Sequence, residues 1–304
     1  MVGFPPFDLV CDIVELCGDD RVTFTACSLV SSTWRRASQH TLFSSVFVTP
    51  TNSARNTTAF RTLLETREDL AHPIRRLNIG IGDVQRADMC THVHLPVLLA
   101  LLQKLPNLTS LHIDALHVVS WPQAIPLPSS PRLKLHALYL HRTDFEEVDF
   151  PWQSLSHLLG IFHFVELLET YHLTRTRCPR VASIPPFHLP RISSLKFDCS
   201  QHQLGEQLWE FVQADQVLAV DLTAFEHTYG EFFQEYQNVL RAFPGIKHLK
   251  LAHPDPHDGT MLEPVLDLQH CRNIESIQYN ITLPRRPKQV GLHEFYPSAL
   301  PNAG

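Results

Sequence analysis

The sequence predicts an α/β protein in which a small N-terminal helical module precedes a curved parallel sheet with helices along its outer side. Three observations predict this fold. The first part of the chain has helical periodicity, a strand-like apolar pattern then recurs, and amphipathic helices fall between its copies. The 304 residues are enough for a small and a larger domain. We expect a helical module at residues 1–47, a repeat solenoid at 48–283 and a poorly ordered tail at 284–304.

The composition narrows the class of protein. Apolar residues make up 44% of the chain, which is typical of a globular protein, and a formal net charge of −6 argues against a nucleic-acid partner. The seven scattered Cys include no CxxC pair, which is typical of an intracellular protein, cytoplasmic or nuclear. The longest apolar stretch, near Leu95–Leu102, is too short to span a bilayer, so no membrane partner is expected either.

Three short helices are predicted near the N-terminus. Asp8 is a suitable N-cap for the first, Asp19 or Asp20 for the second, and the third carries Trp34. Three such helices bury only a small core, so we expect the module to dock on a partner or on the next domain. The second helix is predicted to turn these apolar residues inward: Val22, Ala26, Leu29 and Val30.

Two runs in this module resemble a known family. Residues 6–14 (PFDLVCDIV) are similar to the opening of the F-box, and residues 26–34 (ACSLVSSTW) are similar to its second half. The resemblance covers residues 4–47, with Pro5 and Asp8 where the family has Leu and Glu. It implies binding to the Skp-type adaptor of a cullin ubiquitin ligase. The matching positions, expected to contact the adaptor, are Pro6, Leu9, Val10, Ile13, Leu29, Val30 and Trp34.

The rest of the chain repeats one template, apolar-x-x-apolar-x-apolar. Copies start about 29 residues apart with amphipathic helices between them, which indicates leucine-rich-repeat-like units. A compact α/β domain is the alternative, but it should show a Gly-rich phosphate loop or shorter crossovers. The copies are Phe43/Val46/Val48, Ile74/Leu77/Ile79, Leu108/Leu111/Ile113, Leu135/Leu138/Leu140, Leu168/Tyr171/Leu173, Ile192/Leu195/Phe197, Val217/Val220/Leu222, Ile246/Leu249/Leu251 and Ile274/Ile277/Tyr279.

One row of residues is predicted to face a binding partner. Side chains alternate along a strand, so the residue between the last two apolar positions of each copy points to the concave face. Solenoids bind partners there, although a simply solvated sheet face is the alternative. The row predicted to bind the partner contains Asn78, His112, Tyr139, His172, Lys196, Asp221, Lys250 and Gln278.

No catalytic or metal-binding motif emerges from the sequence. His92-x-His94 places two imidazoles on one side of a strand without a fixed third ligand, and the His and Asp residues of 253–258 read as a solvated loop. We find no nucleophile elbow, HExxH, P-loop or GxGxxG. We therefore expect no enzyme activity, no catalytic residue, no metal and no cofactor.

The sequence favours a substrate receptor that holds a Skp-type adaptor and an unknown target protein within a cullin ligase complex. The alternative is a repeat-type interaction scaffold unconnected with ubiquitin ligase, in which the helices merely cap the solenoid. Burial of Leu9, Val10 and Ile13 against the first repeats would favour the scaffold, and their exposure as a continuous patch would favour the receptor.

Overall fold

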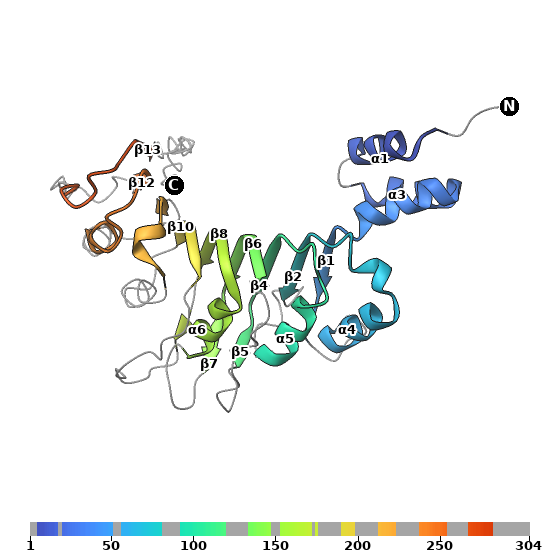
Figure 1. Cartoon of the computed structure of the whole chain (residues 1–304), viewed down its shortest axis with the longest axis horizontal. Coiled ribbons are helices and arrows are strands. Elements are labelled where there is room, and N and C mark those ends of the chain that lie inside the picture. The colour runs from blue at the N-terminus through green and yellow to red at the C-terminus, as the bar shows by residue number, and fades with distance from the viewer. Residues whose placement is uncertain are drawn as a thin grey trace, which may run out of the picture.

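The computed structural model describes residues 5–17, 20–50, 56–80, 92–119, 133–146, 153–171, 174–175, 190–197, 212–222, 237–253 and 267–281. Three helices come first and a long sheet follows, with further helices packed on one of its sides (Figure 1). The helices are α1 (Phe7–Leu16), α2 (Arg21–Val30), α3 (Ser32–Leu42), α4 (Thr57–Thr66), α5 (Leu95–Leu102) and α6 (Gln153–Gly160).

The main sheet is parallel and open, and each strand pairs with the next one that joins the sheet along the chain. This order is that of a solenoid-like fold, so the predicted α/β class with an open parallel sheet is confirmed. Among the described residues its strands are β1 (Ser45–Val48), β2 (Arg76–Gly80), β4 (Ser110–Asp114), β6 (Leu133–His141), β8 (Phe162–Tyr171), β10 (Arg191–Phe197), β11 (Ala219–Leu222), β12 (His248–His253) and β13 (Ser276–Ile281).

A second, smaller parallel sheet was not foreseen. It contains β3 (His92–His94), β5 (His117–Val119), β7 (Asp144–Glu146) and β9 (Thr174–Arg175). β5 and β7 each follow a main strand after a two-residue corner. Ala115 and Arg142 occupy equivalent corner positions with positive φ angles of 53° and 47°. Their amides donate to the carbonyls of His141 and Tyr171 in the next coil, at 3.0 and 2.7 Å.

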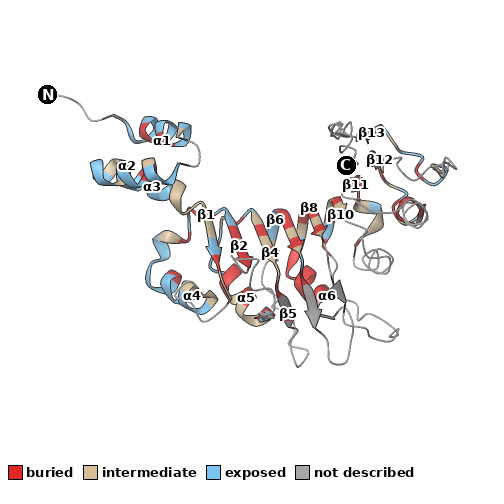
Figure 2. Cartoon of the chain, turned by 180° about the vertical axis from the view of Figure 1, so that it is seen from behind, coloured by how far each residue is buried: buried red, intermediate tan, exposed pale blue. Residues whose placement is uncertain are grey.

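The main core lies between the sheet and its helices. Leu111, Leu138 and Leu168 form one register row across β4, β6 and β8, and all three are buried. Leu101 of α5 and Leu158 of α6 belong to the same buried cluster. Figure 2 shows this buried side along the middle strands. Strand residues therefore alternate between the core and an open face opposite the helices.

The N-terminal helices have a separate core. Val10, Val14, Phe24 and Ala37 form a cluster distinct from that of the sheet. The prediction that Val22, Ala26, Leu29 and Val30 face inward is wrong, because all four are exposed and Phe24 is buried instead. The aromatic ring of Phe24 fills the small interior and so sets the inward side of α2. The N-cap of α1 is Pro6, and Asp8 lies in the first helical turn.

One strand of the repeat was predicted out of register. The copy Leu168/Tyr171/Leu173 is wrong, since the buried residues of β8 are Phe162, Val165, Leu168 and Thr170, and the last three have the spacing of the template. Strand pairing places Glu169 opposite both Tyr139 of β6 and Lys196 of β10. Glu169 therefore takes the row position assigned to His172, which lies outside the described residues.

Candidate functional site

The first candidate surface consists of two apolar stripes on the N-terminal helices, called here the helix stripes. On α1, Leu9, Ile13 and Leu16 recur at helical spacing and are exposed, Leu16 by 87%. On α2, Val22, Leu29 and Val30 are exposed in the same way, Leu29 by 76%. Single exposed apolar residues are common, but stripes of them on neighbouring short helices are typical of an interaction surface.

The residues predicted to bind an adaptor divide between this surface and the module core. Pro6, Leu9, Ile13, Leu29 and Val30 are exposed. Val10 is fully buried, and Trp34 is half-buried against the same core. The sequence missed Leu16 and Val22 as surface residues, although both extend the helical spacing of the exposed residues and this signal would have identified them.

Contacts with α3 hold in place α1 and α2, the two helices that carry the stripes. The carboxylate of Asp20 accepts hydrogen bonds from the amides of Val22 and Thr23, which caps α2. Arg35 Nε of α3 donates to the carbonyl of Ser28 at 3.2 Å and ties α3 to α2. The Arg36 guanidinium lies 5.2 Å from the ring centroid of Phe7, which joins α3 to the start of α1.

The second candidate surface is the middle of the open face. His112 from β4, Tyr139 and His141 from β6, and Tyr171 from β8 form an aromatic cluster. The centroids of the His112 and His141 rings are 4.6 Å apart, and Tyr139 and Tyr171 lie at 5.6 to 5.9 Å from one of them. Parallel pairing of β4, β6 and β8 in register brings these rings together.

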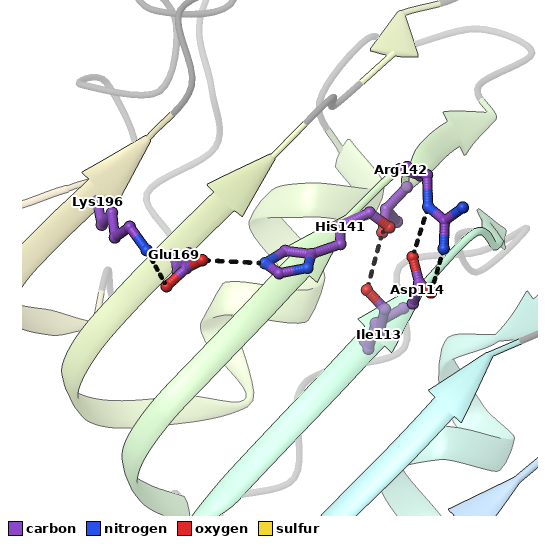
Figure 3. A network of polar contacts seen from close by, with 7 residues as sticks. Ile113, Asp114, His141, Arg142, Glu169 and Lys196 are labelled. Carbon is purple, nitrogen blue, oxygen red and sulfur yellow. Dashed lines mark hydrogen bonds and ion pairs between the residues drawn. The ribbon is translucent and has the colours of Figure 1, made fainter. Parts of the chain in front are cut away.

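Ion pairs flank the aromatic cluster (Figure 3). Glu169 Oε2 lies 3.1 Å from Lys196 Nζ, and its Oε1 lies 3.3 Å from His141 Nε2. On the other side, Arg142 Nε donates to Asp114 Oδ1 at 2.9 Å and a second guanidinium nitrogen binds Oδ2. The acidic and basic side chains thus compensate one another locally.

Burial keeps the two histidines of the cluster neutral. It lowers the pKa of His112, with a further contribution from His141 nearby. It also lowers the pKa of His141, where Glu169 opposes the shift by favouring the charged form. His112 Nε2 is buried without a hydrogen-bond partner in the part of the chain that the structure describes. At neutral pH the cluster is therefore an uncharged aromatic surface between two charge pairs.

Strand register aligns the whole predicted open-face row, from Asn78 of β2 to Gln278 of β13, with Glu169 in the position assigned to His172. His112, Tyr139 and Lys196 lie within or beside the aromatic cluster, and Asp221 faces Lys250 at 3.9 Å. At the two ends of the row, Asn78 lies beside His112 in the strand register and its Nδ2 donates to Ser45 Oγ at 3.5 Å, and Gln278 is exposed. Glu169 and Tyr171 were missed because β8 was predicted out of register.

Among the residues whose side chains the structure describes, no group of three or more His, Cys, Asp or Glu is placed to hold a metal ion. None of the described helices is both long and apolar enough to cross a membrane.

Comparisons with known proteins add little to this geometry. No family model matches the sequence, and a search of curated proteins finds no match. Among solved structures, the chain is similar to one in the crystal structure of the Rad7 and Elc1 complex in yeast, at 12% identity and a TM-score of 0.23. That likeness covers 81% of this chain and 74% of the other, and at so low a TM-score it carries no argument about fold or function.

Proposed function

We propose that the protein is a non-enzymatic substrate receptor of an SCF-type cullin ubiquitin ligase. The helix stripes bind a Skp-type adaptor, and the open face of the sheet binds a target protein. The observation that carries the proposal is the exposure of Leu9, Ile13 and Leu29, at positions that match the F-box pattern, on a module that has its own core.

A simple capping role fits this arrangement poorly. A cap would bury the outward residues of α1 against the first repeats, yet Leu9 and Ile13 are exposed and the two hydrophobic cores are separate. A helical module this small gains stability when a partner covers its apolar surface. Full burial of a side chain such as Leu29 contributes about 1.5–3 kcal/mol to association.

The open face supplies the second half of the function. Its aromatic cluster offers flat apolar surface with polar edges, a composition enriched in protein interfaces. Holding a target there and an adaptor on the helix stripes places the target near the catalytic subunits, which raises its effective concentration. The receptor itself then needs no cofactor and no catalytic residue.

The test is co-purification of the full-length chain with a Skp-type adaptor. Leu16→Arg/Leu29→Arg places a charge on each helix stripe, and both positions lie in the last helical turn, where a cation suits the helix dipole. Losing both side chains from the interface should weaken binding at least about 100-fold. The matched control is Leu218→Arg, an exposed apolar position next to β11 in the sheet domain.

Adaptor retained by the wild type and the Leu218 variant but lost by the double variant supports the receptor. Absence of adaptor from the folded wild type, or equal binding by all three chains, overturns it and leaves the interaction scaffold as the alternative.

A further inference from the structure

A line of exposed cations crosses the edge of the open face at which the strands begin. The four residues, called here the basic strip, are Arg75, Arg76, Lys134 and Arg191. Arg76 begins β2, Lys134 lies near the start of β6, and Arg191 begins β10. No salt bridge joins any of these four side chains to a carboxylate of the described residues.

Strand register and burial place the basic strip on the open face. Lys134 of β6 and Arg191 of β10 both pair with Phe164 of β8. The residue that follows Arg76, Lys134 or Arg191 is in each case buried in the main core: Leu77, Leu135 and Ile192. Because side chains alternate along a strand, the three cations point to the side opposite the helices.

The carboxylates of this face are already engaged. Glu166 lies close to the basic strip on β8, and its Oε2 is 2.7 Å from His136 Nδ1. Other described carboxylates of the face are likewise paired with cations: Asp114, Glu169, Asp221 and Glu275. The basic strip is therefore a local excess of positive charge on a chain whose formal net charge is −6.

The dimensions of the basic strip suit an extended peptide. From β2 to β10 the strip crosses four strand spacings of about 4.8 Å, or about 19 Å in all. An extended chain advances about 3.3 Å per residue, so about six residues cover this distance. Between the cations, Phe164 offers a half-buried ring, and Lys134 Nζ lies 5.2 Å from its centroid. The strip thus combines separated charges with an apolar contact.

We propose that the basic strip binds an acidic, extended segment of the target protein. The carboxylates of such a segment supply the anions that the strip lacks. The proposal rests on the proposed function in taking the open face as the surface that holds the target, and it makes no use of the helix stripes. The small number of cations and the negative net charge of the chain favour a short acidic peptide over a nucleic acid.

The test is fluorescence anisotropy of a labelled peptide titrated with the full chain. The peptide is a Glu-Ser repeat of about eight residues, which spans the strip when extended, and the comparison peptide has Gln in place of every Glu. The chain should bind the Glu-Ser peptide and not the Gln-Ser peptide. Binding should weaken as salt is raised from about 50 to about 200 mM, because the cations are exposed and salt screens them.

Variants identify the surface that binds the peptide. Arg76→Gln and Arg191→Gln should each weaken binding about threefold, as expected for one exposed ion pair, and the double variant about tenfold. The matched control is Arg61→Gln, which removes the same charge from α4 on the helix side of the sheet, where Arg61 pairs with Glu65 at 3.5 Å. It should leave peptide binding unchanged, and far-UV circular dichroism should show that every variant is folded.

Peptide binding that weakens in the strip variants and persists in Arg61→Gln supports the proposal. The proposal is overturned if the folded wild type does not bind the Glu-Ser peptide, or if all variants bind it equally. It is also overturned if an oligothymidylate of equal charge binds more tightly and loses affinity in the same variants, because the strip is then a nucleic-acid surface. The assay contains no adaptor, so this proposal and adaptor binding by the helix stripes can fail separately.

Discussion

The three-helix module should open independently of the sheet, and Val10 should control how readily it opens. Val10 is fully buried among Val14, Phe24 and Ala37. Val10→Ala removes two methyl groups, each worth about 0.8 kcal/mol on transfer, and leaves a cavity, so the module should lose about 2 kcal/mol. That is a large part of the stability of so small a core.

Leu9, the residue that precedes Val10 on the same helix, provides the matched control. Its side chain is 49% exposed, so Leu9→Ala should cost no more than about 1 kcal/mol while removing a residue of the helix stripes. The two variants therefore separate stability from binding. Val10→Ala should destabilise the module, whereas Leu9→Ala should mainly weaken capture of the adaptor.

Amide hydrogen exchange followed by mass spectrometry measures the opening of the module and of the sheet separately, because it gives exchange rates for each segment of the chain. For Val10→Ala, amides of α1–α3 should exchange about 30-fold faster, which corresponds to 2 kcal/mol, while amides of β4 and β6 should keep their rates. Two results would refute the reasoning. Equal acceleration by Leu9→Ala would mean that Leu9 is a core residue. Acceleration in the sheet would mean that the two cores are coupled, as in a solenoid cap.

Two further predictions concern the sheet. Ala115→Gly should stabilise the protein by up to about 1 kcal/mol in urea denaturation, because the φ angle of Ala115 is 53°, a conformation that glycine adopts without strain. Ala137→Gly, inside β6, should destabilise the protein. Changes of the same sign in both variants would contradict this reasoning. Stability should also fall as the pH drops below about 6.5, because burial lowers the pKa of His112 and His141 and the unfolded chain then binds more protons. His112→Asn/His141→Asn should flatten the fall in urea midpoint, and an unchanged slope would exclude these two groups as its source.

The strand template located the main sheet because parallel strands under helices bury every second residue. Leu77, Leu111 and Leu138 are all buried as the template requires. It failed at β8, where Thr170 holds a core position that the template reserves for an apolar residue. Threonine has the β-branched shape that packs well in a strand, so it can fill a buried strand position that a pattern of apolar residues does not identify.

Two other features could not be predicted from the spacing of apolar residues in the sequence. β5 and β7 have three residues each, too few for any pattern to stand out, so the small sheet was not predicted. α2 carries apolar residues on two sides, and their spacing does not determine which side packs into the core. Phe24 decides it, because the small interior accommodates the larger ring.

The corrected register of β8 changes the character of the open face. With Glu169 in the row, Lys196 gains a carboxylate partner at 3.1 Å, just as Lys250 faces Asp221 at 3.9 Å. The register also places Asp221 between Lys196 and Lys250, so each lysine of the row has a neighbouring carboxylate. The row is charge-compensated, and the neutral aromatic cluster becomes its distinguishing feature. Contacts made there should therefore depend on shape and aromatic packing, and should weaken little as salt is raised.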